Sequence, residues 1–300
     1  MTIHYRPGTP DDSYATFQVF LESITDLSQR QGVAALTGGD DPAVLANLWE
    51  NRRSLYDHLA RTAEHFWVAE TEERMIGYAR SILRDGHREL TEFFVLPGQQ
   101  SQGVGKNLLS RAFPPDGASN RTVIASSDTR AQVLYMKNKV YPRTPIVHFS
   151  NPPQVTPYTT DLTFQPMTLT ADTLEVLAHI DRSLLGYRRD TDHRYLVSNR
   201  QGFTYLRQGQ PVGYGYAGYR SGPFAMLQAA DIPVVLAHAE GLLVGVEDEF
   251  GLEVPLVNQT AIDYLLGRGF ELASFTATLM SDRPFGNFES YICTAPPFFL

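Results

Sequence analysis

The feature that most constrains the fold is a repeated order of segments in the two halves of the 300-residue chain. Gly77-Tyr78 is followed nine residues later by Gly86, and Gly213-Tyr214 is followed at the same interval by Gly222. In each half these glycines belong to two strand-like apolar segments that come after segments with helical spacing. A solenoid repeats every 20–50 residues or so, whereas this repeat takes up about half of the chain. The sequence therefore predicts a duplicated domain.

We predict the α/β (α+β) class, with two similar domains in tandem, residues 1–150 and 151–300. Each domain is expected to be a mixed, mostly antiparallel sheet flanked by helices. The polar segment "SNPPQVTPYTT", residues 150–160, has the composition of a linker. The charged and aromatic segment "YRRDTDHRY", residues 187–195, either covers a cleft or forms a solvated loop.

Composition and charge exclude several classes of function. The net charge of -8 argues against a nucleic-acid binder and tolerates a cationic partner. The single cysteine, Cys293, excludes an intramolecular disulfide and a cysteine-pair zinc site. No histidine pair has metal-ligand spacing, and no apolar stretch of about 18 residues exists, so we expect a cytoplasmic protein without metal or membrane partner.

A glycine-containing loop, "PGQQSQGVGK", joins an apolar strand to a helix that begins near Val104. Its spacing fits neither G-x-G-x-x-G nor the Walker A sequence. A glycine-rich turn from strand to helix presents backbone N–H groups and the positive end of the helix dipole. These groups suit a diphosphate, and Lys106 adds charge at the edge. The alternative is that the glycines only satisfy turn geometry.

The spacing Val95-x-Pro97-x-x-Gln100-x-x-Gly103-x-Gly105 resembles the acyl-CoA loop of the GCN5-related N-acetyltransferases, the GNAT superfamily. In that family the loop binds the CoA pyrophosphate through backbone amides, and the preceding strand diverges from its neighbour to bind the pantetheine arm. The resemblance implies that acetyl-CoA is the co-substrate and that the residues in contact with it are Phe94, Val95, Gln100, Ser101, Gln102, Gly103, Val104, Gly105 and Lys106.

The helix after Asp128 resembles a second motif of the family, N-x-x-A-x-x-x-Y-x-x-x-G-F, through Ala131 and Tyr135. It departs from the motif at Asp128 and at Lys139-Val140, which stand in place of asparagine and Gly-Phe. The resemblance makes Tyr135 the general acid for the leaving thiolate; a core tyrosine is the alternative.

The second half keeps the spacing of this second motif at Asn258, Ala261 and Gly269-Phe270, but Leu265 stands at the tyrosine position. The segment "ADIPVVLAHAEGLLVGVEDEFG", which precedes this helix, contains no Q/R-x-x-G-x-G sequence. The resemblance therefore implies one CoA site, in the N-terminal domain, and a degenerate second domain without the phosphate loop.

The resemblance also places the general base on the strand that leads into the loop, where Glu89 and Glu92 are candidates. Strand alternation puts them on opposite faces, and Glu92 lies nearer the expected thioester. A solvated carboxylate is the alternative. Tyr14, Phe17 and Phe20 either line the acceptor cavity or belong to the core.

The expected function is transfer of an acetyl group from acetyl-CoA to a primary amine of a small molecule by direct attack. The main alternative is a non-catalytic acyl-CoA-binding or interaction protein on the same fold. A two-domain synthase resembling mycothiol synthase is disfavoured, because that enzyme is active in its C-terminal half and the C-terminal half of this chain lacks the phosphate loop. The acceptor and the assembly, for which a homodimer is one option, stay open.

Overall fold

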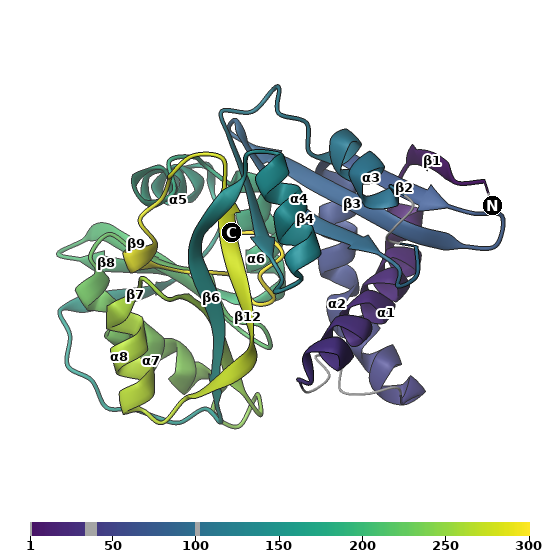
Figure 1. Ribbon diagram of the computed structural model, residues 1–300. Helices are drawn as coiled ribbons and strands as arrows, with labels where there is room; N and C mark the ends of the chain where they lie inside the picture. Colours follow the sequence, from purple (N-terminus) through teal and green to yellow (C-terminus); the bar gives the residue numbers. More distant parts are fainter. Residues whose placement is uncertain (1, 34–40, 100–102) are drawn as a thin grey trace. The chain divides into compact units, whose positions relative to one another are not determined.

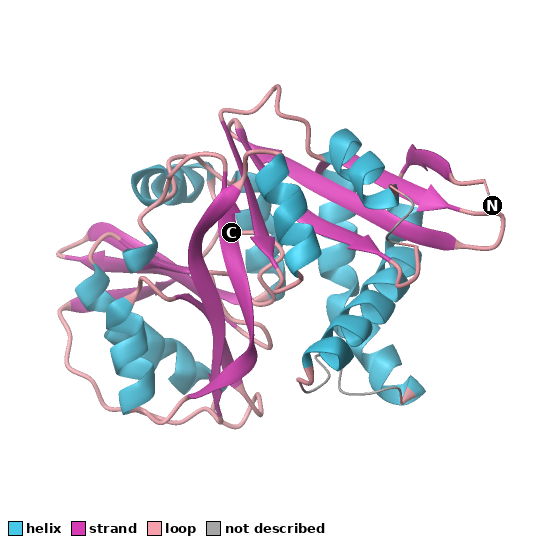
Figure 2. Ribbon diagram, viewed as in Figure 1, coloured by secondary structure: helices cyan, strands magenta, loops and turns pink. Residues whose placement is uncertain are grey.

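The chain forms two compact units in a computed structural model that describes residues 2–33, 41–99 and 103–300. The first unit comprises residues 1–123 and 128–140, and the second comprises residues 124–127 and 141–300. Figure 2 shows that each unit combines helices with strands. No helix in the described ranges is long and apolar enough to cross a membrane.

The elements of the first half are β1 (His4–Pro7), α1 (Ser13–Gln31), α2 (Pro42–Thr62), β2 (Ala63–Glu70), β3 (Met75–Arg84), β4 (His87–Val95), α3 (Val104–Ala112), β5 (Asn120–Ala125), α4 (Thr129–Lys137) and β6 (Tyr141–Asn151). A short 3-10 turn, Pro10–Asp12, precedes α1, where Thr9 is the N-cap and Pro10 takes the first position of the turn.

The sheet of the first unit has the strand order β1-β2-β3-β4-β5, and all its neighbours are antiparallel except β4 and β5. Arg80 donates from Nη1 to the carbonyl of Tyr56 on α2 (2.8 Å), whereas Ser81 donates from Oγ to the carbonyl of Ala112 on α3 (2.6 Å). Successive strand residues point to opposite faces. The α1–α2 pair and α3 therefore cover opposite faces of the sheet (Figure 1).

The second half repeats this order with β7 (Leu162–Pro166), α5 (Ala171–Leu184), α6 (Asp190–Asn199), β8 (Gln201–Arg207), β9 (Gln210–Ala217), β10 (Phe224–Met226), α7 (Ile232–Leu243), β11 (Phe250–Pro255), α8 (Gln259–Gly267) and β12 (Glu271–Ser281), followed by β13 (Tyr291–Ile292). Both halves thus run β-α-α-β-β-β-α-β-α-β. The predicted α/β class, with two similar mixed domains, is confirmed.

The second unit contains the strands β13-β10-β9-β8-β7 in one sheet, and β12, β6 and β11 lie side by side in that order. β6 pairs antiparallel with both β11 and β12. Because β6 belongs to the second unit, the two units divide after residue 140, ten residues before the end of the predicted first domain. The apolar core of this unit joins α7 and α8 to the strands, for example through Leu236 and Leu265.

Residues 187–195, predicted to cover a cleft or to form a solvated loop, do not form a solvated loop. They lead into α6, and Arg189 and His193 are buried in the second unit. A segment whose charged residues hydrogen-bond to one another in the core can have the same composition as a solvated polar loop. Composition alone therefore does not show whether such a segment is buried or exposed to solvent.

The helices α4 and α8 confirm the match between the halves in detail. The carboxylate of Asp128 and the amide oxygen of Asn258 each accept a backbone N–H at the start of their helix. At the other end, Lys139 has φ 65° and Gly269 has φ 77°, so both residues take the left-handed conformation that ends the helix. Lys139 thus adopts the backbone of the glycine that it replaces in the motif.

Candidate functional site

The candidate site lies where β4 separates from β5. Within the described residues, β5 pairs with β4 from His87 to Leu90, and the pairing stops there. On its other side, β4 stays paired with β3 as far as Val95. The register on that side shifts between Leu90 and Glu92, which makes Thr91 the extra residue of a β-bulge. The divergence that the resemblance implied is therefore present in this strand.

The bulge corrects the predicted orientation of the two glutamates. Glu89 lies opposite Ile82, and Glu92 lies opposite Arg80. Ile82 and Arg80 are two residues apart on β3, so Glu89 and Glu92 share one face of the sheet and do not point to opposite faces. Simple alternation failed because the bulge adds one residue between them.

The helix α3 begins beside the end of β4. Gly103 caps it with φ 76°, and among the described residues a Cβ atom there would meet only the Asn107 amide nitrogen, at 3.8 Å. Gly103 and Lys106 are exposed, so this helix start faces solvent. A Cβ atom at Gly105 would approach Phe93 Cζ to 3.1 Å. Gln100, Ser101 and Gln102 of the predicted loop lie outside the described residues.

Tyr135 of α4 is brought to the same place. It is buried, and its ring lies 6.1 Å from the ring of Phe93. Burial, with a smaller contribution from Asp128, raises the pKa of its hydroxyl. Phe93 therefore lies next to both Gly105 and Tyr135. We did not predict a role for Phe93, although its alternation with Phe94 in the sequence could have suggested one residue for each face.

On the opposite face of β4, aromatic side chains from α1 and α2 pack next to the strand. Phe94 packs edge-to-face on Phe20 at 5.2 Å, and Ser23 of α1 donates to the Val95 carbonyl at 3.4 Å. Tyr14 is half-exposed and packs on Trp49 at 5.1 Å. Of the three predicted acceptor residues, Phe17 and Phe20 are buried and Tyr14 reaches the surface.

Glu92 lies in a buried polar network on this same face. Its side chain has no exposed surface, and Arg80 Nε lies 2.9 Å from Glu92 Oε2 in an ion pair. Tyr78 donates its hydroxyl to Glu92 Oε1 at 2.9 Å. Burial raises the pKa of Glu92, although the Arg80 guanidinium and the Tyr78 hydroxyl oppose this rise. The sequence signal that we missed was Arg80, a charged residue within the apolar strand "MIGYARSIL".

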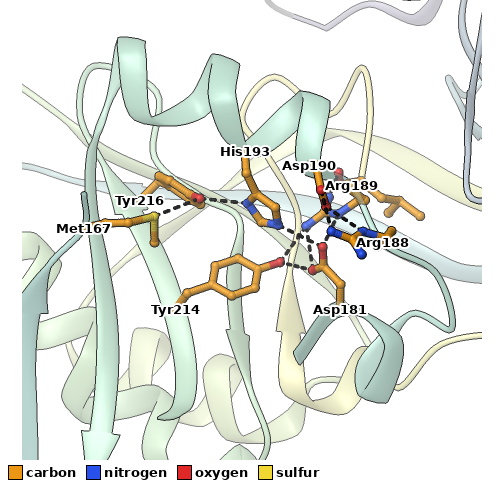
Figure 3. A network of polar contacts seen from close by, with 9 residues as sticks. Met167, Asp181, Arg188, Arg189, Asp190, His193, Tyr214 and Tyr216 are labelled. Atoms are coloured by element: carbon orange, nitrogen blue, oxygen red, sulfur yellow. Dashed lines mark hydrogen bonds and ion pairs between the residues drawn. The ribbon is translucent and has the colours of Figure 1, made fainter. Parts of the chain in front are cut away.

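The second unit has a buried network at the corresponding tyrosine (Figure 3). Tyr214 donates to Asp181, and His193 Nε2 lies 2.8 Å from Asp181 Oδ2. Arg189 Nη2 donates to the Tyr214 hydroxyl at 2.6 Å, and Tyr216 contacts His193 Nδ1. Although burial alone would raise it, the charges of Arg189 and His193 lower the pKa of Asp181 to about 2.

A separate cavity of about 340 Å³ lies in the second unit between β7, β8 and the start of α5. Its wall includes Thr170, Thr173 and Thr204 together with Met167, and none of the predicted site residues lines it. Among the described residues, no group of histidine, cysteine and carboxylate side chains is arranged to hold a metal ion.

Comparison with known proteins agrees with this geometry. Residues 62–139 match the acetyltransferase (GNAT) domain family. No curated protein matches the sequence. Among solved structures, a protein from Pyrococcus horikoshii assigned as an acetyltransferase aligns with a TM-score of 0.73 at 14% identity, covering 96% of this chain and 92% of that chain.

Two further structures align over nearly the whole chain. A tandem GNAT protein from the clavulanic acid biosynthesis pathway has a TM-score of 0.55 at 12% identity, with 94% of this chain and 99% of that chain covered. A GCN5-related N-acetyltransferase from Sphaerobacter thermophilus gives 0.58 at 14% identity, with 96% and 98% covered. At these identities the likeness shows the fold. Residues 62–139 thus match a GNAT domain, and the chain has the fold of a tandem GNAT protein.

Proposed function

We propose that this chain is an N-acetyltransferase that moves an acetyl group from acetyl-CoA to a primary amine of a small molecule by direct attack. It has one CoA site, in the N-terminal domain, and a second domain that lacks the phosphate loop. The observation that carries the proposal is the divergence of β4 from β5 beside the exposed start of α3. The proposal places the protein in the cytoplasm and builds the site from one chain, without nucleic acid or metal.

The described residues fit acetyl-CoA, which supplies an activated thioester when bound. The N–H groups at the start of α3, from Gly103 to Lys106, suit a diphosphate because the helix dipole adds positive potential there. The backbone of Phe94 and Val95 lies beyond the point where β5 leaves β4, where the pantetheine arm would bind. Gln100, Ser101 and Gln102 keep the role in the loop that the resemblance implies.

Two side chains are proposed to move protons. Tyr135, whose pKa is raised by burial, is protonated at neutral pH and is proposed to donate its proton to the leaving sulfur. Glu92 is proposed as the acceptor of the proton of the amine. Since Glu92 is fully buried, the Tyr78 hydroxyl, which is buried beside it and donates to it, is proposed to relay this proton. The aromatic residues of α1 and α2 next to Phe94, with Tyr14 at the surface, are proposed to line the acceptor side.

The test is CoA release from acetyl-CoA across a panel of small amines, followed by Tyr135→Phe. We expect kcat to fall tenfold or more, because general acid catalysis contributes roughly 10²–10⁴ in rate, with little change in KM for acetyl-CoA. Tyr264→Phe is the matched control, since Tyr264 precedes the equivalent position on α8. Unchanged kcat in Tyr135→Phe would remove this tyrosine from the reaction.

One observation favours a non-catalytic acyl-CoA-binding protein as the second candidate. Glu92 has no exposed surface and is ion-paired, and Tyr135 is buried. The same assay separates the two functions. Calorimetric binding of acetyl-CoA without release of CoA for any amine would support the binding protein and contradict the enzyme.

A further inference from the structure

In the second unit, a strand from the chain itself lies between β10 and β11. Tyr291 and Ile292 form β13, which pairs antiparallel with Ala225 and Phe224 of β10. The next residue, Cys293, bridges to β11 on the other side, where its N–H donates to the Glu253 carbonyl at 2.9 Å. Residues 291–293 therefore hydrogen-bond to strands on both sides.

Register identifies this position with the candidate site of the first unit. Tyr78 lies opposite Phe94 in the first unit, and Tyr214 lies opposite Ala225 in the second. Ala225 is thus the counterpart of Phe94. In the first unit β5 has left β4 before Phe94, whereas in the second unit Tyr291 pairs directly with Ala225.

In each unit the slot is the space beside the fourth strand, next to Phe94 in the first unit and next to Ala225 in the second. We propose that residues 291–293 occupy this slot in the second unit, whereas in the first unit it binds the pantetheine arm of CoA. The second unit thus binds a strand of its own chain where a GNAT domain binds a cofactor. The name of the slot rests on the proposed function, but the occupancy by residues 291–293 does not. The ligand of this site is a peptide segment that forms main-chain hydrogen bonds by strand addition.

Buried groups hold the segment in place, some on other elements and one within the C-terminal segment itself. Asn258 donates from Nδ2 to the Tyr291 carbonyl at 3.2 Å, and Thr294 donates from Oγ1 to the Phe299 carbonyl at 2.6 Å. Arg189 donates to the Leu300 carbonyl and lies over the Tyr291 ring. The Asp181 network of Figure 3 fixes Arg189 and so serves as an anchor for this segment.

The start of the helix after β10 supports the same conclusion independently. Asp231 caps α7, and its carboxylate accepts from Arg207 at 2.7 Å. Pro233 in the first turn has no N–H. A fixed carboxylate and a missing donor oppose the binding of a diphosphate, so α7 lacks the properties that the start of α3 has. An attached segment also competes at high effective concentration against any free ligand.

Cys293 provides a native probe, because it is the only cysteine of the chain and is fully buried in the slot. We would measure its alkylation by iodoacetamide with mass spectrometry in the full chain. We expect alkylation at least ~100-fold slower than in the urea-unfolded chain, because only opening of the slot exposes the thiol. Saturating acetyl-CoA, which has no free thiol, should leave the rate unchanged. Rapid alkylation, or acceleration by acetyl-CoA, would overturn the proposal.

A pair of variants tests the anchors. Thr294→Val removes the hydroxyl that binds the Phe299 carbonyl and should raise the alkylation rate about fivefold or more. Thr144→Val removes a similarly buried hydroxyl in β6 and should leave the rate unchanged. Equal rates in the two variants would contradict the anchoring. Failure of acetyl-CoA to bind would contradict the proposed function alone, because the alkylation rates of the two variants are compared without acetyl-CoA.

Discussion

The helix that follows the fourth strand begins differently in the two units. α3 begins at Gly103 and presents Lys106 to solvent, whereas α7 begins at a carboxylate, Asp231, that is already paired with Arg207. The first arrangement attracts an anion and the second repels one. The difference teaches that one copy of a duplicated fold can lose the chemistry of a site and keep every helix and strand.

The polar cores differ in the same sense. Tyr78 and Tyr214 occupy equivalent strand positions, and each donates to a buried carboxylate paired with a buried arginine. In the first unit the carboxylate belongs to β4 itself, next to the bulge. In the second unit Asp181 comes from α5 and fixes Arg189, which contacts the segment in the slot.

The largest expected effect tests the core of the first unit. Arg80→Met leaves the carboxylate of Glu92 buried without its cation, so the free energy of unfolding should fall by about 3–5 kcal/mol. Urea unfolding followed by tryptophan fluorescence reports on this unit, because Trp49 and Trp67 both lie in it.

Two variants sharpen that measurement. Glu22→Gln breaks the exposed pair with Arg74 and should cost less than about 1 kcal/mol. The double variant Arg80→Met with Glu92→Leu should recover most of the lost stability, because no charge stays buried. If Arg80→Met costs no more than Glu22→Gln, the ion pair does not stabilise the first unit.

The next effect separates the two networks by pH. The pKa of Asp181 is about 2 in the folded chain, against an ordinary value of 3.8, so its stabilisation is present above about pH 4 and is lost as the pH falls toward 2. The loss should be on the order of 2 kcal/mol. Hydrogen exchange of peptides from α5 and β9 measures it.

The first unit should respond in the opposite sense. Burial raises the pKa of Glu92, so acidification from above its folded pKa toward 4.5 relieves a cost of the charged form. Asp181→Asn should flatten the acid dependence of the second unit and leave that of the first unit unchanged. Parallel loss of both units in the wild type and in Asp181→Asn would contradict this contrast.

The smallest effect concerns the ends of α4 and α8. Lys139 holds a left-handed backbone where the second unit has Gly269. Lys139→Gly should therefore stabilise the first unit by about 0.5–1 kcal/mol, and Gly269→Lys should destabilise the second by a similar amount. Calorimetric melting of both variants checks this. Destabilisation by Lys139→Gly would mean that contacts of the lysine outweigh its backbone cost.

Part of this account could be predicted from the sequence because local patterns carried it. The repeat at Gly77-Tyr78 and Gly213-Tyr214 predicted the matching strands, and the helix expected near Val104 is α3, whose buried residues include Val104, Leu108 and Leu109. The bulge at Thr91 could not be predicted, because it depends on pairing with a neighbouring strand. Glu89 and Glu92 were misplaced for that reason.

Residues far apart in the sequence account for the rest. Nothing in the local pattern of residues 291–293 indicates that they pair with β10, about 65 residues earlier, since strand pairing is a property of the folded chain. The same holds for Arg189 and His193, whose buried partners come from α5 and β9. Polar composition alone does not distinguish a satisfied core network from a solvated loop.

The central claim is that only the first unit has an open slot for CoA, and calorimetric titration with acetyl-CoA tests it most directly. We expect one site per chain, with affinity lowered more than tenfold, above about 1.4 kcal/mol, by Gly103→Val. Gly245→Val is the matched control, since Gly245 has φ 74° against 76° at Gly103 and also has open space around it, so its affinity should be that of the wild type. Two equivalent sites per chain, or normal binding by a folded Gly103→Val protein, would contradict the account.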